Sequence, residues 1–148
     1  MNTPGWLEFI GDRNIDSVHA ADDYIVQRFI PTYEQTGCGF WCVVELSTKE
    51  PIGTISMIQR ENLDEIDLGF AFLPKYEGNG FAFEASQAIL EKERKESGLQ
   101  SVLAFTDLNN QRSRKLLSKL GFSELGLKIV KPEWGESLLY RLVLEKDQ

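Results

Sequence analysis

The residues best suited to chemistry lie in the stretch Leu68–Gly80, LGFAFLPKYEGNG, which runs directly into FAFEA. The pattern predicts an apolar strand, a loop with two glycines, Gly78 and Gly80, and then a helix. The N–H groups that open a helix have no partner within it, so this loop can bind a phosphate without any basic side chain. The stretch therefore predicts a site for a phosphate-bearing ligand.

The glycine spacing excludes two common nucleotide sites. A P-loop needs Gly-Lys-Ser/Thr after four intervening residues, and Gly78-Asn79-Gly80-Phe81 offers none of that. A dinucleotide fingerprint, G-x-G-x-x-G, has glycine where this chain has Phe83. What remains is Lys75-x-x-Gly78-x-Gly80, for which the alternative interpretation is a turn whose glycines only supply positive φ.

A second motif, Thr106–Phe122 or TDLNNQRSRKLLSKLGF, follows another predicted strand and opens another helix. Asn110 and Ser113 are three residues apart, so both can face one groove near the start of that helix. The alternative is that Asn110 only caps the helix and that its basic residues form a solvated face. Those basic residues are Arg112, Arg114, Lys115 and Lys119.

Length and composition narrow the class of protein. A chain of 148 residues predicts one domain, residues 1–148, with a single core. The net charge of −7 argues against a nucleic-acid partner and is compatible with an amine substrate. No apolar run approaches the ~20 residues of a membrane span and no secretory signal is visible, so we expect no membrane partner and a cytoplasmic location. Cys38 and Cys42 lack metal-site spacing and His19 is the only histidine, so we predict free thiols and no metal site.

The elements that must position these motifs follow from hydrophobic periodicity and from turn residues. A short helical turn is predicted at Pro4–Ile10, and a helix capped by Asp16 or Ser17 runs to Ile30 and stops at Pro31. The other predicted helices are Gly80–Ser97 and one that Asn109 or Asn110 caps and that ends at Leu120. The predicted strands are Gly39–Leu46, Ile52–Gln59, Glu65–Leu73, Ser101–Thr106, Phe122–Val130 and Ser137–Leu144. A hairpin followed by a β-α-β unit predicts an α+β (α/β) fold, a mixed sheet with helices on both faces.

Taken together, the two motifs resemble those of the GNAT superfamily of acetyl-CoA-dependent N-acetyltransferases. KYEGNG stands where that family carries its Gln/Arg-x-x-Gly-x-Gly/Ala pyrophosphate loop. NNQRSRKLLSKLGF is similar to its second signature, Asn-x-x-Ser followed by a helix ending in Lys-Leu-Gly-Phe. LGFAFLPKYEGNGFAFEA is especially similar to the Rim-type ribosomal-protein N-acetyltransferases. The resemblance extends from about Gly5 to Leu144 and implies the GNAT-like acyl-CoA N-acyltransferase fold, with a mostly antiparallel, twisted sheet.

The resemblance also implies a site for acetyl-CoA as co-substrate. In the family, the strand before the loop separates from the next strand, pantetheine enters the gap, and the pyrophosphate binds the N–H groups of the loop. Asn110 would bond the pantetheine arm, and Lys115 or Arg114 would meet the 3′-phosphate. Lys75 replaces the family's Gln or Arg, which matters little because the pyrophosphate binds to the main chain of the loop. The predicted cofactor-binding residues are Phe72, Leu73, Lys75, Gly78, Asn79, Gly80, Phe81, Ala82, Asn110, Ser113 and Lys115.

Acetyl transfer requires that the amine lose a proton, that the thioester carbonyl be polarised and that the departing thiolate be stabilised. Glu65 and Asp67 alternate onto one face of their strand. Asp67 is the predicted base, since in the family an acidic residue often precedes Leu/Ile-Gly-Phe/Tyr; the alternative is that both are solvent-facing carboxylates. A backbone N–H near Phe72 or Leu73 would polarise the carbonyl, and Ser113 would donate to the thiolate. The predicted catalytic residues are thus Asp67 and Ser113.

Family members normally begin with a strand and most of a helix before the segment that matches PGWLEFIGDR here. The sheet is therefore expected to lack its first strand and to expose an edge, which favours pairing with a second copy as a homodimer. The leading hypothesis is transfer of an acetyl group from acetyl-CoA to a primary amine of a small molecule or protein. The alternatives are an acyl-CoA-binding relative with little or no catalysis, and an interaction module that uses the open edge.

Overall fold

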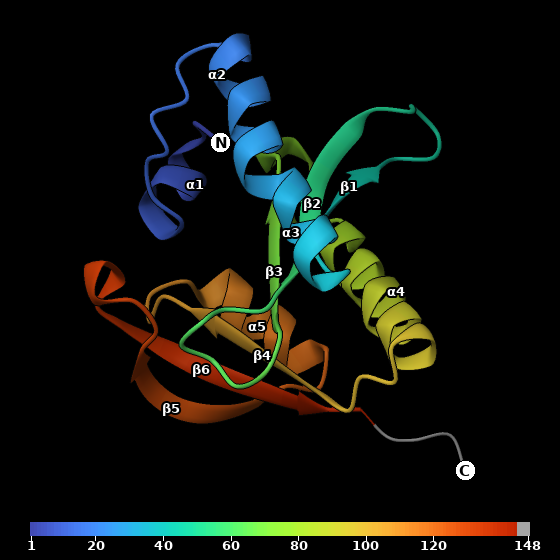
Figure 1. Ribbon diagram of the computed structural model, residues 1–148, viewed down its shortest axis with the longest axis vertical. Coiled ribbons are helices and arrows are strands. Elements are labelled where there is room, and N and C mark those ends of the chain that lie inside the picture. The colour runs from blue at the N-terminus through green and yellow to red at the C-terminus, as the bar shows by residue number, and fades with distance from the viewer. Residues whose placement is uncertain (145–148) are drawn as a thin grey trace.

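Helices and strands follow one another largely as the sequence predicts (Figure 1). The structure is a computed structural model that describes residues 1–144, so the last four residues of the predicted domain lie outside the described part. The helices are α1 (Pro4–Phe9), α2 (Val18–Tyr24), α3 (Ile30–Thr36), α4 (Phe81–Glu96) and α5 (Gln111–Lys119). The strands are β1 (Phe40–Val44), β2 (Pro51–Ile58), β3 (Asp67–Phe72), β4 (Ser101–Thr106), β5 (Ser123–Ile129) and β6 (Glu136–Val143). Within residues 1–144, no helix combines the length and the apolar character that crossing a membrane requires.

The helix that was predicted to run from Asp16 or Ser17 to Ile30 is longer in the structure. Ser17 is its cap, since the Ser17 hydroxyl oxygen accepts from the Ala20 N–H at 3.1 Å. The predicted end at Pro31 is wrong, because a π-helical segment, Ile25–Phe29, joins α2 to α3. In that segment the Ile30 N–H bonds the carbonyl five residues back, and the wider turn lets the helix continue across a proline, which has no N–H to donate. The helix ends at Gly37, whose φ of 71° suits a left-handed cap.

One six-stranded sheet carries the fold, in the order β1-β2-β3-β4-β6-β5. All neighbouring strands are antiparallel except β3 and β4, which are parallel. This arrangement confirms the predicted mixed and mostly antiparallel sheet, with the β1–β2 hairpin and the β3-α4-β4 unit. Of the described residues, Phe40 is the first to lie in a strand, and β1 forms one edge of the sheet.

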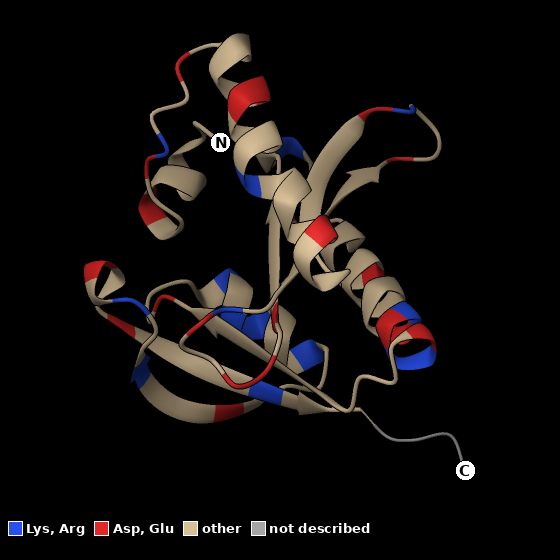
Figure 2. Ribbon diagram, viewed as in Figure 1, with Lys and Arg blue, Asp and Glu red and all other residues tan. Residues whose placement is uncertain are grey.

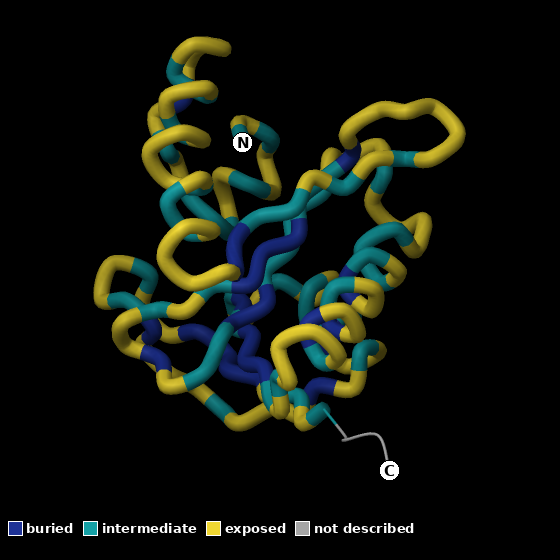
Figure 3. Tube along the Cα trace, turned by 45° about the vertical axis from the view of Figure 1, so that its right-hand side comes forward, coloured by how far each residue is buried: buried dark blue, intermediate teal, exposed yellow. Residues whose placement is uncertain are grey.

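The sheet is covered on both faces. On one face, Leu90 of α4 and Leu117 of α5 are buried in the main core together with side chains from β2, β3, β4 and β6. Neighbouring strand residues point to opposite faces, so Phe40 and Trp41 of β1 address different sides of the sheet. Trp41 packs against the main core, whereas Phe40 stacks on Phe29 with the ring centroids 3.7 Å apart. The π-helical segment that ends at Phe29 therefore covers the face opposite α4, whereas Tyr33 of α3 reaches Trp41 on the other side, with the ring centroids 6.3 Å apart. Buried residues run along the strands of the sheet (Figure 3).

A smaller core lies on the face opposite α4 and α5, around β4 and β6. Its buried members are Leu63, Leu103, Val130 and Leu139, and Phe105 and Trp134 pack against them. Leu63 comes from the β2–β3 turn and Val130 from the β5–β6 connection, which also contains a short 3-10 helix, Pro132–Trp134, so these two connections close this side around β4 and β6. The β3 and β4 strands thus have different coverings on their two faces.

Close packing between β2 and β3 generates a first prediction. A Cβ at Gly53 would lie 2.6 Å from the Phe72 ring and 2.7 Å from the Ala71 carbonyl oxygen, and a paired strand backbone cannot move aside. Because overpacking of this kind costs about 1–3 kcal/mol, we expect Gly53→Ala to lower the free energy of unfolding by about that amount in urea denaturation. Gly5→Ala is the control, since nothing lies within 4 Å of its Cβ. Equal stability of both variants would contradict the packing of Phe72 over β2.

Candidate functional site

The candidate site is a split in the sheet between β3 and β4. The two strands pair only at Asp67 and Leu103, and the Leu103 N–H donates to the Ile66 carbonyl at 2.9 Å. After this point they diverge (Figure 1), although β3 stays paired with β2 as far as Phe72. The split is therefore closed at Asp67 and Leu103, and it opens toward the carboxyl ends of both strands.

Backbone groups of both strands face into this split. The Leu73 N–H donates to the Ile52 carbonyl of β2 at 2.9 Å. Because residues of an antiparallel strand alternate in the side they address, Phe70 and Phe72 direct their N–H and C=O groups toward β4. Phe105 of β4 faces β3 in the same way, two residues after Leu103. Of the two N–H groups predicted to polarise a carbonyl, that of Leu73 is used inside the sheet, and that of Phe72 faces the split.

The glycine loop lies at the open end of the split, between β3 and α4. Gly78 and Gly80 have φ values of 76° and 86°, and a Cβ at either would meet nothing within 4 Å. The first bond of α4 is from the Glu84 N–H to the Gly80 carbonyl at 3.0 Å, and no side chain caps this helix. The earlier N–H groups, those of residues 81–83, have no helix carbonyl to bond and carry the positive end of the helix dipole. An open cradle of N–H groups fits a pyrophosphate, as the sequence predicts for this loop.

The start of α5 lies at the same end of the split, after β4. Asn110 is the N-cap, and its side-chain oxygen accepts from the Ser113 N–H at 3.1 Å. That Asn110 caps this helix is thus confirmed, and the cap uses its side-chain oxygen, so the amide NH2 group can still donate to another partner. Ser113 is half-buried on the first turn of α5. Two residues from the second motif are therefore brought together beside the glycine loop.

Side-chain contacts connect the two sides of the open end. Glu77 of the glycine loop forms an ion pair with Arg112 of α5. The Lys119 ammonium of α5 lies 4.2 Å from the centroid of the Phe83 ring of α4. Lys75 points elsewhere, with its ammonium 3.2 Å from a carboxylate oxygen of Glu50 in the β1–β2 loop. Lys75 can thus contribute its main chain to the loop, while its side chain forms an exposed ion pair with the β1–β2 loop.

Basic residues gather on α5, as Figure 2 shows, and two of them were predicted to meet a 3′-phosphate. Arg114 is engaged, since its Nε lies 3.4 Å from the Tyr140 hydroxyl and its Nη1 donates to the Leu108 carbonyl at 3.3 Å. Arg114 also pairs with Glu124 at 3.6 Å. Lys115 is exposed. Of the two alternatives, Lys115 is the side chain that a ligand at the surface can reach.

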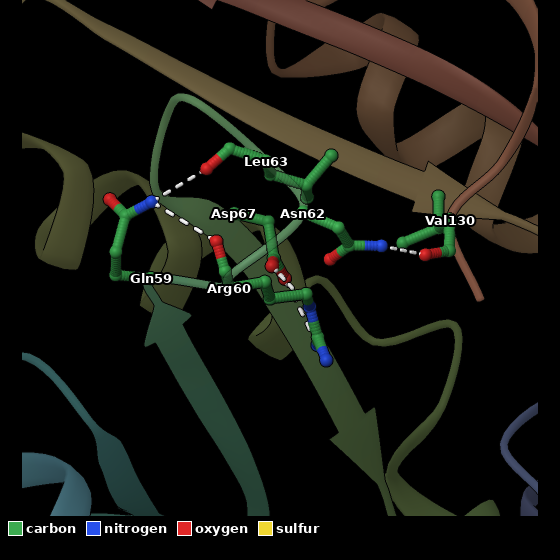
Figure 4. Close-up of polar contacts among 6 residues, drawn as sticks. All are labelled: Gln59, Arg60, Asn62, Leu63, Asp67 and Val130. Atoms are coloured by element: carbon green, nitrogen blue, oxygen red, sulfur yellow. Dashed lines mark hydrogen bonds and ion pairs between the residues drawn. The ribbon is translucent and has the colours of Figure 1, made fainter.

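Asp67 does not face the open end. It is 1% exposed, and its two oxygens lie 2.5 Å from Arg60 Nε and 3.3 Å from Arg60 Nη2 (Figure 4). Burial raises the pKa of the Asp67 carboxyl, and the positive charge of Arg60 acts in the opposite direction. A general base must reach the amine proton directly or through one water. The predicted base role does not fit a buried carboxylate that Arg60 holds at the closed end.

Glu65, the other candidate carboxylate, is also engaged in structural contacts. It accepts from the Ser101 hydroxyl and pairs with Arg141 Nε at 3.1 Å. The alternative of two solvent-facing carboxylates is therefore wrong for Asp67, which is buried, while Glu65 is partly exposed. Sequence reasoning missed Arg60, although a single cation seven residues before Asp67, across the polar turn ENLDE, is a signal for a pair between neighbouring strands.

Comparison with known proteins agrees with these features. Residues 2–123 match the family model of an acetyltransferase (GNAT) domain. YoaA of Bacillus subtilis, an uncharacterized N-acetyltransferase, is 30% identical over 122 residues, which cover 80% of this chain and 67% of YoaA. Two further Bacillus subtilis relatives are matched over about half of their own length.

Solved structures share the fold. An acetyltransferase from Agrobacterium tumefaciens has a TM-score of 0.76 at 21% identity, over 96% of this chain and 80% of that one. The ribosomal-protein-S5-alanine acetyltransferase of Vibrio fischeri has a TM-score of 0.68 at 21% identity, over 84% of this chain and 71% of that one. These structures agree in fold, and the match of residues 2–123 to the family model confirms the family resemblance that the two motifs predicted.

The cap of α5 generates a second prediction. Asn110→Ala removes the oxygen that accepts from the Ser113 N–H, and loss of such a cap costs about 1 kcal/mol. Asn110→Asp keeps an acceptor at that position, so we expect it to retain stability close to that of the unaltered protein. Urea unfolding of both variants measures the difference. Equal losses in the two variants would show that the cap does not stabilise α5.

Proposed function

Because this chain belongs to the GNAT acetyltransferase family, we propose that it transfers the acetyl group of acetyl-CoA to a primary amine of a small molecule or protein. One observation carries the proposal: the β3–β4 pairing stops after Asp67 and Leu103, and the glycine loop and the start of α5 both lie where the strands have parted. A parallel pair that separates toward its carboxyl ends provides a crevice of the kind in which α/β proteins bind ligands.

The chemistry of the split suits the parts of acetyl-CoA. The amides of a pantetheine arm match the backbone groups that Phe72 and Phe105 direct into the split, since an extended chain can pair with an open strand edge. The pyrophosphate matches the uncapped N–H groups at the start of α4. The Asn110 NH2 group can donate to the pantetheine arm, and exposed Lys115 can meet the phosphate at the adenosine end.

In the proposed reaction, the neutral amine attacks the thioester carbonyl carbon, a C–N bond forms and the C–S bond breaks. The Phe72 N–H donates to the carbonyl oxygen, on which negative charge develops. The Ser113 hydroxyl donates to the sulfur as it leaves with the electron pair. Since Asp67 is buried and paired, we assign it no proton transfer, and the amine proton passes to water. An acidic chain of net charge −7 is compatible with a cationic amine as the acceptor.

Acetyl-CoA binding and turnover test this proposal. We expect calorimetric titration to show micromolar binding, and free thiol to appear when primary amines and N-terminal peptides are supplied as a panel. Ser113→Ala is expected to lower kcat by about 10²-fold, in the range for loss of one donor to a developing anion, with acetyl-CoA binding retained.

Ser118→Ala is the matched control, because Ser118 lies on the same helix and is exposed. It should leave kcat unchanged. No acetyl-CoA binding at high micromolar concentration would overturn the proposed function. Binding without thiol release for any amine would instead support the alternative of a CoA-binding relative without catalysis.

A further inference from the structure

Arg60 and Asp67 form a buried ion pair at the closed end of the split. The side chains of Arg60 and Asp67 are 19% and 2% exposed. Both Asp67 oxygens accept from the guanidinium, so the pair has the two-point geometry that only arginine supplies. Asp67 is also the β3 residue that pairs with Leu103 of β4, the last point of contact between the two strands. The ion pair thus lies at the residue where the strands begin to part.

Arg60 contacts β4 as well as β3. Its guanidinium carbon lies 5.0 Å from the centroid of the Phe105 ring and 5.5 Å from that of Trp134. The Phe105 and Trp134 rings stack with their centroids 5.6 Å apart. Phe105 is the first β4 residue after Leu103 whose backbone faces β3. Arg60 therefore contacts Asp67, the last β3 residue that pairs with β4, and Phe105, the first β4 residue that faces β3 without pairing.

The turn that carries Arg60 is itself held in place (Figure 4). The Gln59 side chain donates to the Leu63 carbonyl at 2.8 Å, and Asn62 donates to the Val130 carbonyl near the β5–β6 connection. Leu63 is buried in the smaller core. Arg60 thus projects from a fixed support, and it cannot shift without disturbing contacts on three sides.

We propose that Arg60 and Asp67 are positioning residues, which set the geometry at which β3 and β4 diverge and hence the shape of the acetyl-CoA site. The inference rests on the proposed function. The two walls of the split are the backbones of Phe72 and Phe105, and their separation depends on where the strands part. Small misplacements of reacting groups lower the reaction rate by large factors. A change in the strand positions at the closed end should therefore change how acetyl-CoA is placed at the open end.

Two conservative variants test the proposal. Arg60→Lys keeps the charge but loses the second hydrogen bond and the guanidinium contacts with the Phe105 and Trp134 rings. Asp67→Asn keeps the shape but loses the charge. We expect each to raise the KM and the calorimetric Kd for acetyl-CoA by about 10-fold, because a displaced wall of the split would lose about one hydrogen bond to the ligand. The pH profile of kcat should keep its shape in both variants.

Amide hydrogen exchange gives a readout that does not depend on acetyl-CoA. The Leu103 N–H donates to the Ile66 carbonyl, so it should be protected in the unaltered protein. We expect exchange in the peptide that covers residues 101–106 to be faster in both variants, because the β3–β4 contact is loosened.

Arg94→Lys is the matched control. It makes the same substitution in another two-point arginine–carboxylate pair, since Arg94 Nε and Nη2 lie 3.0 Å and 2.9 Å from the two carboxylate oxygens of Glu91, on α4 and outside both β3 and β4. This variant should leave the acetyl-CoA KM and the exchange of residues 101–106 unchanged. An equal increase of KM in Arg94→Lys would overturn the proposal.

Two other results would also overturn it. If Asp67→Asn lowers kcat by more than about 100-fold, with KM unchanged and the basic limb of the pH profile lost, Asp67 is a general base. If both variants lower Tm but leave KM, Kd and exchange unchanged, the pair only stabilises the fold. Failure of the proposed function looks different, since the unaltered protein itself would then not bind acetyl-CoA.

Discussion

The parallel pairing of β3 with β4 stops at Asp67 and Leu103, and the arrangement of the site depends on this constraint. Backbone N–H and C=O groups inside a protein need partners, and a strand normally finds them on its neighbour. By separating, β3 and β4 leave such groups directed at one another without pairing between the strands. A ligand with its own amide groups could pair with them, and for this reason we propose the split as the binding site.

The rest of the fold compensates for the interruption. Toward the open end, α5 is linked to the glycine loop through Arg112 and Glu77, and to α4 through Lys119 on the Phe83 ring. Beneath the split, the main core joins residues from both halves of the sheet, with Leu68 from β3 and Val102 from β4 in the same cluster. The two halves are thus held together by side-chain packing below the split rather than by backbone pairing along it.

At the closed end, the chain uses a buried charge pair where an apolar contact would also fill space. A buried pair is seldom the most stabilising choice, because both charges lose their hydration. What the pair provides is a defined orientation, because two hydrogen bonds and two aromatic contacts hold the Arg60 side chain in one position. A carboxylate that looked catalytic from its place before LGF is, in the folded chain, buried and paired with Arg60. A carboxylate at this strand position can thus act in catalysis or hold neighbouring strands in place. Which of the two it does depends on a partner across the β2–β3 turn.

Local features were determined by the sequence alone. The glycines at 78 and 80, a cap at Asn109 or Asn110, which the structure assigns to Asn110, and the succession of strands along the chain all depend on residues close together in the sequence, whose preferences tertiary contacts did not reverse. Other features depended on contacts between distant segments. The helix runs through Pro31 because a π turn precedes it, and Phe72 rather than Leu73 faces the split because of its register with β2. The role of Asp67 was decided by Arg60, Phe105 and Trp134, which meet only when the β2–β3 turn folds over β4. The spacing of residues along the chain predicts which chemical groups a local segment offers. The fold then decides which of these groups remain free for a ligand, because it brings partners to the others.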